Sequence, residues 1–166
     1  MCHSRTEMIL FDLNSVSLSG SVMIIAGIYL KGSCARIVAL SGTCPKYVRL
    51  SQQVDRLELS SKPTQEDVQT FVQALHAYCT DNEIDVVCVN HRSNEADSDG
   101  GSPASFRAEG IILATSEIPV KLIHSVTVAA AIRKNRGNSY VRPTTVDIGK
   151  AYDLAFVGLC SDVISS

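Results

Sequence analysis

The stretch IIAGIYLKGSCARIVAL, residues 24–40, contains two short aliphatic segments separated by Lys31-Gly32-Ser33. Apolar runs of this length predict strands, and the short glycine-containing break between them predicts a hairpin. A later run, IDVVCV at residues 84–89, has almost no polar residues. Such runs are typical of central strands that helices cover on both faces, so the sequence predicts a layered α/β domain.

The segment between the hairpin and the central strand is predicted to hold one more strand and then a helix. Alternating polar and apolar residues place the strand within residues 46–59. Thr64 and Asp67 resemble a capping box with Asp in place of Glu, which predicts a helix over about residues 64–80. The apolar positions of this segment recur with helical spacing, at Val68, Phe71, Val72, Leu75, Tyr78 and Cys79.

The chain after the central strand is predicted to alternate between helix and strand. Ser102-Pro103 offers an N-cap and a proline at the first helical position. We expect a helix at 103–116, a strand at 119–123, a helix at 125–135 and a final helix that Thr144 or Thr145 caps and that runs to about residue 160. The order β-β-β-α-β-α-β-α, with its last helix split or doubled, predicts a three-layer fold, in which a mixed five-stranded sheet carries helices on both faces.

Composition bounds the size and class of the protein. Its 166 residues are 45% hydrophobic and 19% charged, which suits one folded domain. We expect residues 1–22 to form a weakly structured extension and residues 23–162 to form the domain. The formal net charge of −2 disfavours a globally basic nucleic-acid binder but leaves room for a local basic patch. The longest apolar runs have about eight residues, so we expect no membrane-spanning segment.

The cysteines lie at irregular spacings and form no CxxC pair. A zinc site usually takes its ligands from close pairs, so the pattern does not support one. Free cysteines on apolar faces behave as small hydrophobic residues. We therefore expect reduced structural thiols in a cytoplasmic protein. The six positions are Cys2, Cys34, Cys44, Cys79, Cys88 and Cys160.

Four stretches together follow the pattern of a known superfamily. They are residues 24–40, IDVVCVN at 84–90, the segment from PASFRAEG to AAAIRKN at 103–135, and DIGKAYDLAFVGL at 147–159. They resemble the opening hairpin, central strand, helix-strand-helix unit and closing helix of RuvC-type Holliday-junction resolvases. Residues 27–32, GIYLKG, are similar to the G-V-E-L-K-G-like first strand of a small bacterial family of unknown function. The resemblance implies a ribonuclease H-like fold over about residues 23–160.

The resemblance also implies a two-metal nuclease site, from which this sequence departs. Such sites need carboxylates from several elements around Mg²⁺ or Mn²⁺, which polarise the phosphate and activate water. Tyr29 stands at the carboxylate position of the first strand, and Asn90 stands at that of the central strand. Lys31, His91 and Arg92 are expected near the same strand ends. This combination favours an anion over Mg²⁺.

Three remaining acids are candidates for a rearranged catalytic site. Asp153 lies among apolar residues of the closing helix and is a candidate metal ligand, the alternative being an outward-facing acid. Asp147 is the second candidate ligand, although it could simply stabilise the first helical turn through the dipole. Glu109 matches an acid of the small bacterial family but could equally face solvent. His91 would act as the general acid or base.

Basic residues are densest within residues 133–142. Cations near the end of a helix complement its dipole, and contact with a phosphate backbone is the alternative explanation. The polar loop NEADSDGG, residues 94–101, only partly follows the calcium-loop pattern. We expect it to be solvated, or to serve as a lid or metal donor beside the site. The candidate binding residues are Lys31, Arg92, Arg133, Arg136 and Arg142.

Three functional hypotheses follow. The first, which we favour, is a ribonuclease H-like domain with a degenerate active site that binds nucleic acid or a protein partner. The second is an active Mg²⁺- or Mn²⁺-dependent nuclease or phosphodiesterase with a rearranged acidic site. The third is a homo-oligomeric structural protein, such as a homodimer, that pairs through an edge strand.

Overall fold

The computed structural model describes residues 22–51, 54–91, 101–135 and 140–160. The predicted N-terminal extension therefore lies almost entirely outside the described residues, and it stays a prediction. The strands are β1 (Met23–Lys31), β2 (Cys34–Thr43), β3 (Lys46–Arg49), β4 (Arg56–Glu58), β5 (Val86–Asn90) and β6 (Val120–Ile123). The helices are α1 (Gln65–Asp81), α2 (Pro103–Thr115), α3 (Ser125–Asn135) and α4 (Val146–Cys160).

The strands form one mixed sheet in the order β3-β2-β1-β5-β6, with β4 paired to β2. Strand β1 is antiparallel to β2 and parallel to β5, and β5 is parallel to β6. The carboxyl ends of β1, β5 and β6 therefore lie at one edge of the sheet. The predicted α/β class is confirmed, and the order of elements is the predicted one apart from one additional strand.

The region predicted as one strand within residues 46–59 contains two strands, so the sheet has six strands and not five. Strand β3 pairs with the end of β2 at Leu40 to Thr43, whereas β4 pairs with its beginning at Cys34 to Arg36. Both segments alternate in polarity, and only their separate positions along β2 distinguish them. The last helical part of the chain consists of two helices, α3 and α4, in agreement with the predicted order, whose last helix is split or doubled.

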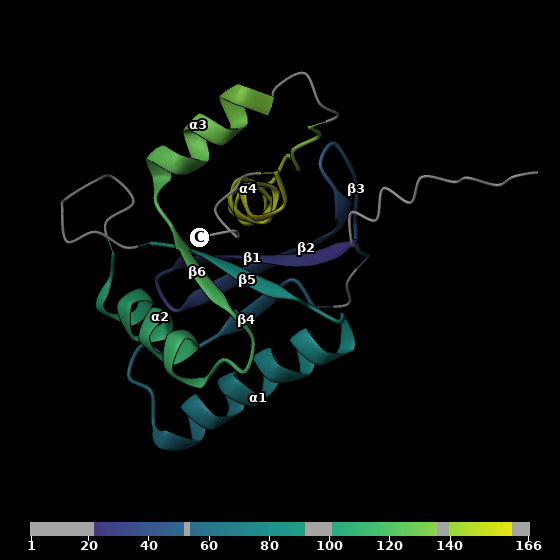
Figure 1. The fold of residues 1–166 in the computed structure, drawn as a ribbon. Helices are drawn as coiled ribbons and strands as arrows, with labels where there is room; N and C mark the ends of the chain where they lie inside the picture. The colour runs from purple at the N-terminus through teal and green to yellow at the C-terminus, as the bar shows by residue number, and fades with distance from the viewer. Residues whose placement is uncertain (1–21, 52–53, 92–100, 136–139, 161–166) are drawn as a thin grey trace, which may run out of the picture.

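Helices cover both faces of the sheet: α1 and α2 lie on one face, and α3 and α4 lie on the other (Figure 1). Alternate side chains of β1 point to opposite faces, as expected for a strand. Ile28 packs with Phe71 of α1 and Ile112 of α2 in one core. Ile25 packs with Phe156 of α4 in the other core. This burial on both faces explains why β1 needs a nearly apolar sequence.

Local capping residues set the starts of two helices. Thr64 and Asp67 form a reciprocal capping box at α1, in which each backbone N–H donates to the side chain of the other residue. Ser102 caps α2, and Pro103 occupies its first turn. These caps satisfy N–H groups that have no partner within the helix. Both predicted helix starts are confirmed.

Helix α4 packs directly on the middle of β1, and Gly27 makes this approach possible. A Cβ atom at residue 27 would lie 2.5 Å from the backbone nitrogen of Ala155, and closer still to the carbonyl oxygen of Ala151. Any larger side chain would therefore force the helix away from the sheet. The close packing buries ten residues of α4 and fixes its first turns over the carboxyl end of β1.

The expectation that every cysteine is a free thiol is wrong, because Cys44 and Cys160 form a disulfide. Helix α4 runs back toward the amino end of β1 and brings its last residue beside the turn after β2, with the two Cα atoms 5.0 Å apart. Cys88 is a free, buried thiol whose pKa is raised by burial to about 12, as expected for a structural residue. No helix in the described ranges is long and apolar enough to cross a membrane.

Candidate functional site

The candidate site lies where β1 and β5 end beneath the first turns of α4. Asn90, the last residue of β5, reaches across to β1. Its Oδ1 accepts a hydrogen bond from the backbone N–H of Leu30 at 2.8 Å, and its Nδ2 donates to the carbonyl of Leu30 at 3.4 Å. The amide therefore continues the pairing of the two strands beyond their backbone register. A carboxylate could accept the first bond but could not donate the second.

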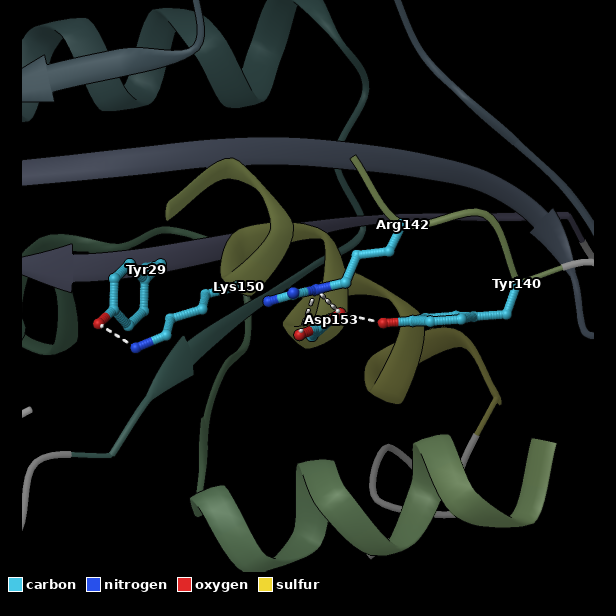
Figure 2. Close-up of polar contacts among 5 residues, drawn as sticks. All are labelled: Tyr29, Tyr140, Arg142, Lys150 and Asp153. Atoms are coloured by element: carbon cyan, nitrogen blue, oxygen red, sulfur yellow. Dashed lines mark hydrogen bonds and ion pairs between the residues drawn. The ribbon is translucent and has the colours of Figure 1, made fainter. Parts of the chain in front are cut away.

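Tyr29 and Lys150 form the centre of this site. Lys150 Nζ, on the second turn of α4, donates a hydrogen bond of 3.0 Å to the hydroxyl of Tyr29 (Figure 2). The same nitrogen lies 4.8 Å from the centroid of the Tyr29 ring, a cation–π distance. Tyr29 is only 4% exposed, so its buried phenol holds the ammonium group of Lys150 in one position. Lys150 was not among the site residues predicted from the sequence, although it is the one cation in the apolar segment 147–159.

Lys31 and Asp147 form an ion pair at the rim of the site. Their Nζ and Oδ1 atoms are 3.3 Å apart, with 63% of the Lys31 side chain and 30% of the Asp147 side chain exposed. Asp147 also lies in the first turn of α4, where a negative charge complements the helix dipole. One of the two predicted metal ligands is thus already paired with a lysine of the chain.

Asp153, the other predicted metal ligand, is buried and faces the segment that precedes α4. Its carboxylate accepts hydrogen bonds from the Nε of Arg142, at 3.1 and 3.2 Å, and from the hydroxyl of Tyr140 (Figure 2). Burial raises the pKa of Asp153, while the Tyr140 hydrogen bond and the charge of Arg142 act in the opposite direction. The interpretation of Asp153 as an outward-facing acid is therefore wrong, because the residue is 7% exposed.

Gly149 leaves the space that the Arg142 guanidinium occupies. A Cβ atom at residue 149 would lie 2.9 Å from both Cζ and Nε of Arg142, so the guanidinium lies directly against this glycine. Burial and the Asp153 hydrogen bond raise the pKa of the Tyr140 hydroxyl, which keeps it protonated as a donor. Asp153, Arg142 and Tyr140 thus form a closed polar group that connects residues 140–142 to α4.

A cavity of about 420 Å³ lies beyond this group, between β3 and residues 141–143. The hydroxyls of Tyr47 and Tyr152 are hydrogen-bonded to each other at 2.9 Å in its wall. Its lining consists of Tyr47, Arg49, Val141, Arg142, Pro143 and Tyr152. The cavity is separate from the Tyr29 and Lys150 contact, because β3 pairs with the part of β2 that lies opposite the beginning of β1.

The other predicted site residues are dispersed. Glu109 lies on α2, across the sheet from α4 (Figure 1). Arg133 is exposed in the last turn of α3, and His91 follows β5. Within the described ranges, no three His, Cys, Asp or Glu side chains cluster closely enough to hold a metal ion. Arg92, Arg136 and all but the last residue of the loop 94–101 lie outside the described residues.

Comparison with known proteins gives a family and a fold. The chain belongs to the family described as "Protein of unknown function (DUF3010)", which matches residues 23–158. No curated protein matches the chain.

Two solved structures of Thermus thermophilus RuvC are similar to the chain, each at 16% sequence identity. One is in complex with a Holliday junction substrate and has a TM-score of 0.61, covering 81% of this chain and 91% of RuvC. The other has a TM-score of 0.63 and covers 81% and 92%. The predicted resemblance to RuvC-type resolvases and to a small family of unknown function is confirmed, and at this identity it establishes the fold.

Proposed function

We propose that this DUF3010 protein is a nucleic-acid-binding module whose carboxyl sheet edge contacts phosphate through lysines and has lost the nuclease metal site. The observation that carries the proposal is the Lys150 ammonium, hydrogen-bonded to Tyr29 at the end of β1. The resemblance implies a metal-binding carboxylate at this strand position. A fixed ammonium group there repels a divalent cation and attracts an anion.

The acids near this edge support the same conclusion. Asp147 is paired with Lys31, and Asp153 is paired with Arg142 and hydrogen-bonded to Tyr140. A two-metal mechanism needs carboxylates that converge on open coordination positions. Here each of the two acids is paired with a cation of the same chain. The side-chain amide of Asn90 forms hydrogen bonds that link β5 to β1.

Phosphate is the anion that this edge suits best. Lys31 is largely exposed and Lys150 is half-buried, so the pair offers one positive charge in solvent and one held against Tyr29. Lysine binds phosphate as a point charge and needs no particular base sequence. Because a similar RuvC structure holds a Holliday junction, branched DNA is the first ligand to test, with duplex DNA and single-stranded RNA beside it.

Fluorescence anisotropy with labelled nucleic acids over a range of salt concentrations tests the proposal. Lys31→Ala and Lys150→Met should each weaken binding several-fold and lower the salt slope by about one, because each removes about one phosphate contact. Lys46→Ala is the matched control, since Lys46 is an exposed lysine at the opposite end of the sheet. Equal affinities for the wild type and the Lys31 and Lys150 variants would refute the proposal.

A cleavage assay separates binding from catalysis. With Mg²⁺ or Mn²⁺ present, we expect the wild-type protein to leave branched DNA, single-stranded DNA and RNA–DNA hybrid intact. Cleavage that disappears in Asp153→Asn would instead establish a rearranged nuclease and make Asp153 a metal ligand. Cleavage that is equal in both proteins would indicate a contaminating nuclease.

The predicted location and oligomeric state also need direct tests. The disulfide between Cys44 and Cys160 counts against a cytoplasmic location, because cytosolic thiols are generally kept reduced. Alkylation of free thiols before cell lysis would show whether these two cysteines are bonded in the cell. Light scattering of the purified protein, with and without DNA, would show whether it is a homodimer.

A further inference from the structure

Two histidines meet at the carboxyl edge of the sheet, one directly after β5 and the other directly after β6. Strands β5 and β6 are parallel, and their last paired residues are Asn90 and Ile123. His91 and His124 follow these residues and therefore leave the sheet side by side. Their imidazole rings are in contact, with centroids 4.2 Å apart and ring planes at 68°.

The backbones of both histidines are fixed by hydrogen bonds. The N–H of His91 donates to the carbonyl of Ile123 at 2.9 Å, and the carbonyl of His124 accepts from Val128 in α3 at 3.1 Å. The ring nitrogen Nδ1 of His91, by contrast, is buried and has no hydrogen-bond partner among the residues that the structure describes. A buried polar atom without a partner is rare in folded proteins, and a bound ion or water is a common explanation.

We propose that His91 and His124 bind one borderline divalent metal ion, such as Zn²⁺ or Ni²⁺, through one imidazole nitrogen each. Imidazole is a preferred ligand of these metals, whereas Mg²⁺ prefers oxygen. The metal–nitrogen bond is about 2.0–2.1 Å long, so the two rings can share one ion when they turn one nitrogen each toward it and move slightly apart. His124 is exposed and is free to make this rotation, which also gives the ion access from solvent.

The site is an open one. The described residues provide no cluster of three His, Cys, Asp and Glu side chains, so the described part of the chain supplies these two ligands and leaves further coordination positions open. The site uses neither Asp147 nor Asp153, and it does not depend on the lysine contacts proposed above. Its test and the nucleic-acid test can therefore fail independently.

Metal titration of the full chain tests the proposal, with any affinity tag removed and the protein first treated with EDTA. Isothermal titration calorimetry should show one equivalent of Ni²⁺ or Zn²⁺ bound and no binding of Mg²⁺. Nitrogen-15 NMR of the imidazole rings should show the His91 Nδ1 signal shifting or broadening with the metal. This measurement uses the wild-type protein, so its result does not depend on whether any variant folds correctly.

Variants then locate the ion. His124→Ala and His91→Phe should each weaken binding by at least about tenfold, because even the loss of an outer-shell partner commonly costs that much. The phenyl ring keeps the packing of His91 without its nitrogens. His3→Ala and His76→Gln are the matched controls and should bind as the wild type does.

Three results of the titrations would overturn the proposal, and one NMR result would do the same. They are no binding at millimolar metal, unchanged binding in both His91→Phe and His124→Ala, or loss of binding in a control variant. A wild-type spectrum in which metal leaves the His91 and His124 ring signals unmoved would also exclude the site.

Discussion

Replacing Gly27 by alanine is expected to destabilise the protein strongly, because Gly27 lies where β1 and α4 touch. The added Cβ would be 2.5 Å from the nitrogen of Ala155, whereas ordinary van der Waals contact begins at 3.4 Å. The atoms in its way belong to the helix backbone, so no side-chain rotation can relieve the overlap. Helix α4 must move by about 1 Å, and overpacking of this kind costs about 1–3 kcal/mol.

Urea unfolding followed by circular dichroism measures this effect. With about 2 kcal/mol lost and a slope of about 2 kcal/mol per molar urea, the unfolding midpoint should fall by about 1 M. Gly110→Ala is the matched control, because it makes the same chemical change in the middle of α2. A Cβ at residue 110 meets no atom within 4 Å, so this variant should gain about 1 kcal/mol from helix propensity.

The two variants are expected to change the free energy of unfolding in opposite directions, and this difference tests the close packing of α4 on β1. If Gly27→Ala unfolds at the same urea concentration as the wild type, α4 does not pack on β1 as closely as the structure describes. A second readout follows from the same movement, since a displaced α4 carries Lys150 away from Tyr29. The folded Gly27→Ala protein should therefore bind nucleic acid more weakly than Gly110→Ala.

Two further predictions concern Asp153 and the disulfide. Burial raises the folded pKa of Asp153 above its ordinary value of 3.8, so the wild type should lose stability relative to Asp153→Asn as the pH rises from about 4 through that raised pKa. Urea unfolding of both proteins between about pH 4 and pH 7 measures this difference, and a gap that widens in the other direction would contradict it. Replacing Cys44 and Cys160 together by serine should cost about 2–4 kcal/mol, because the bond closes a loop with a sequence separation of 116. Thermal unfolding with and without reductant should show the same loss in the wild type, and a variant as stable as the oxidised protein would refute the prediction.

The positions of Tyr29 and Asn90 could be predicted from the sequence, but their contacts in the site could not. Their places at the ends of two predicted strands follow from local pattern, and the missing carboxylates are visible in the sequence itself. The partners of these residues are not visible there. Lys150 is 121 positions from Tyr29, and Asn90 is 60 positions from Leu30, so each contact depends on how whole elements pack.

Features that act over a few residues could be predicted from the amino-acid sequence. Strand and helix periods, the caps at Thr64 and Ser102, and the order of elements follow from side-chain spacing and from hydrogen bonds within one turn. That local order was enough for the α/β class and for the resemblance that the fold confirms.

Contacts between side chains that are distant in the sequence depend on how the helices and strands pack. The close approach of α4 at Gly27 places Lys150 on Tyr29 and returns Cys160 to Cys44. The pairing of Asp153 with Arg142 likewise requires the chain before α4 to lie along that helix. These contacts arise where helices and strands pack against one another. The distance between two side chains in such packing cannot be obtained from their separation in the sequence.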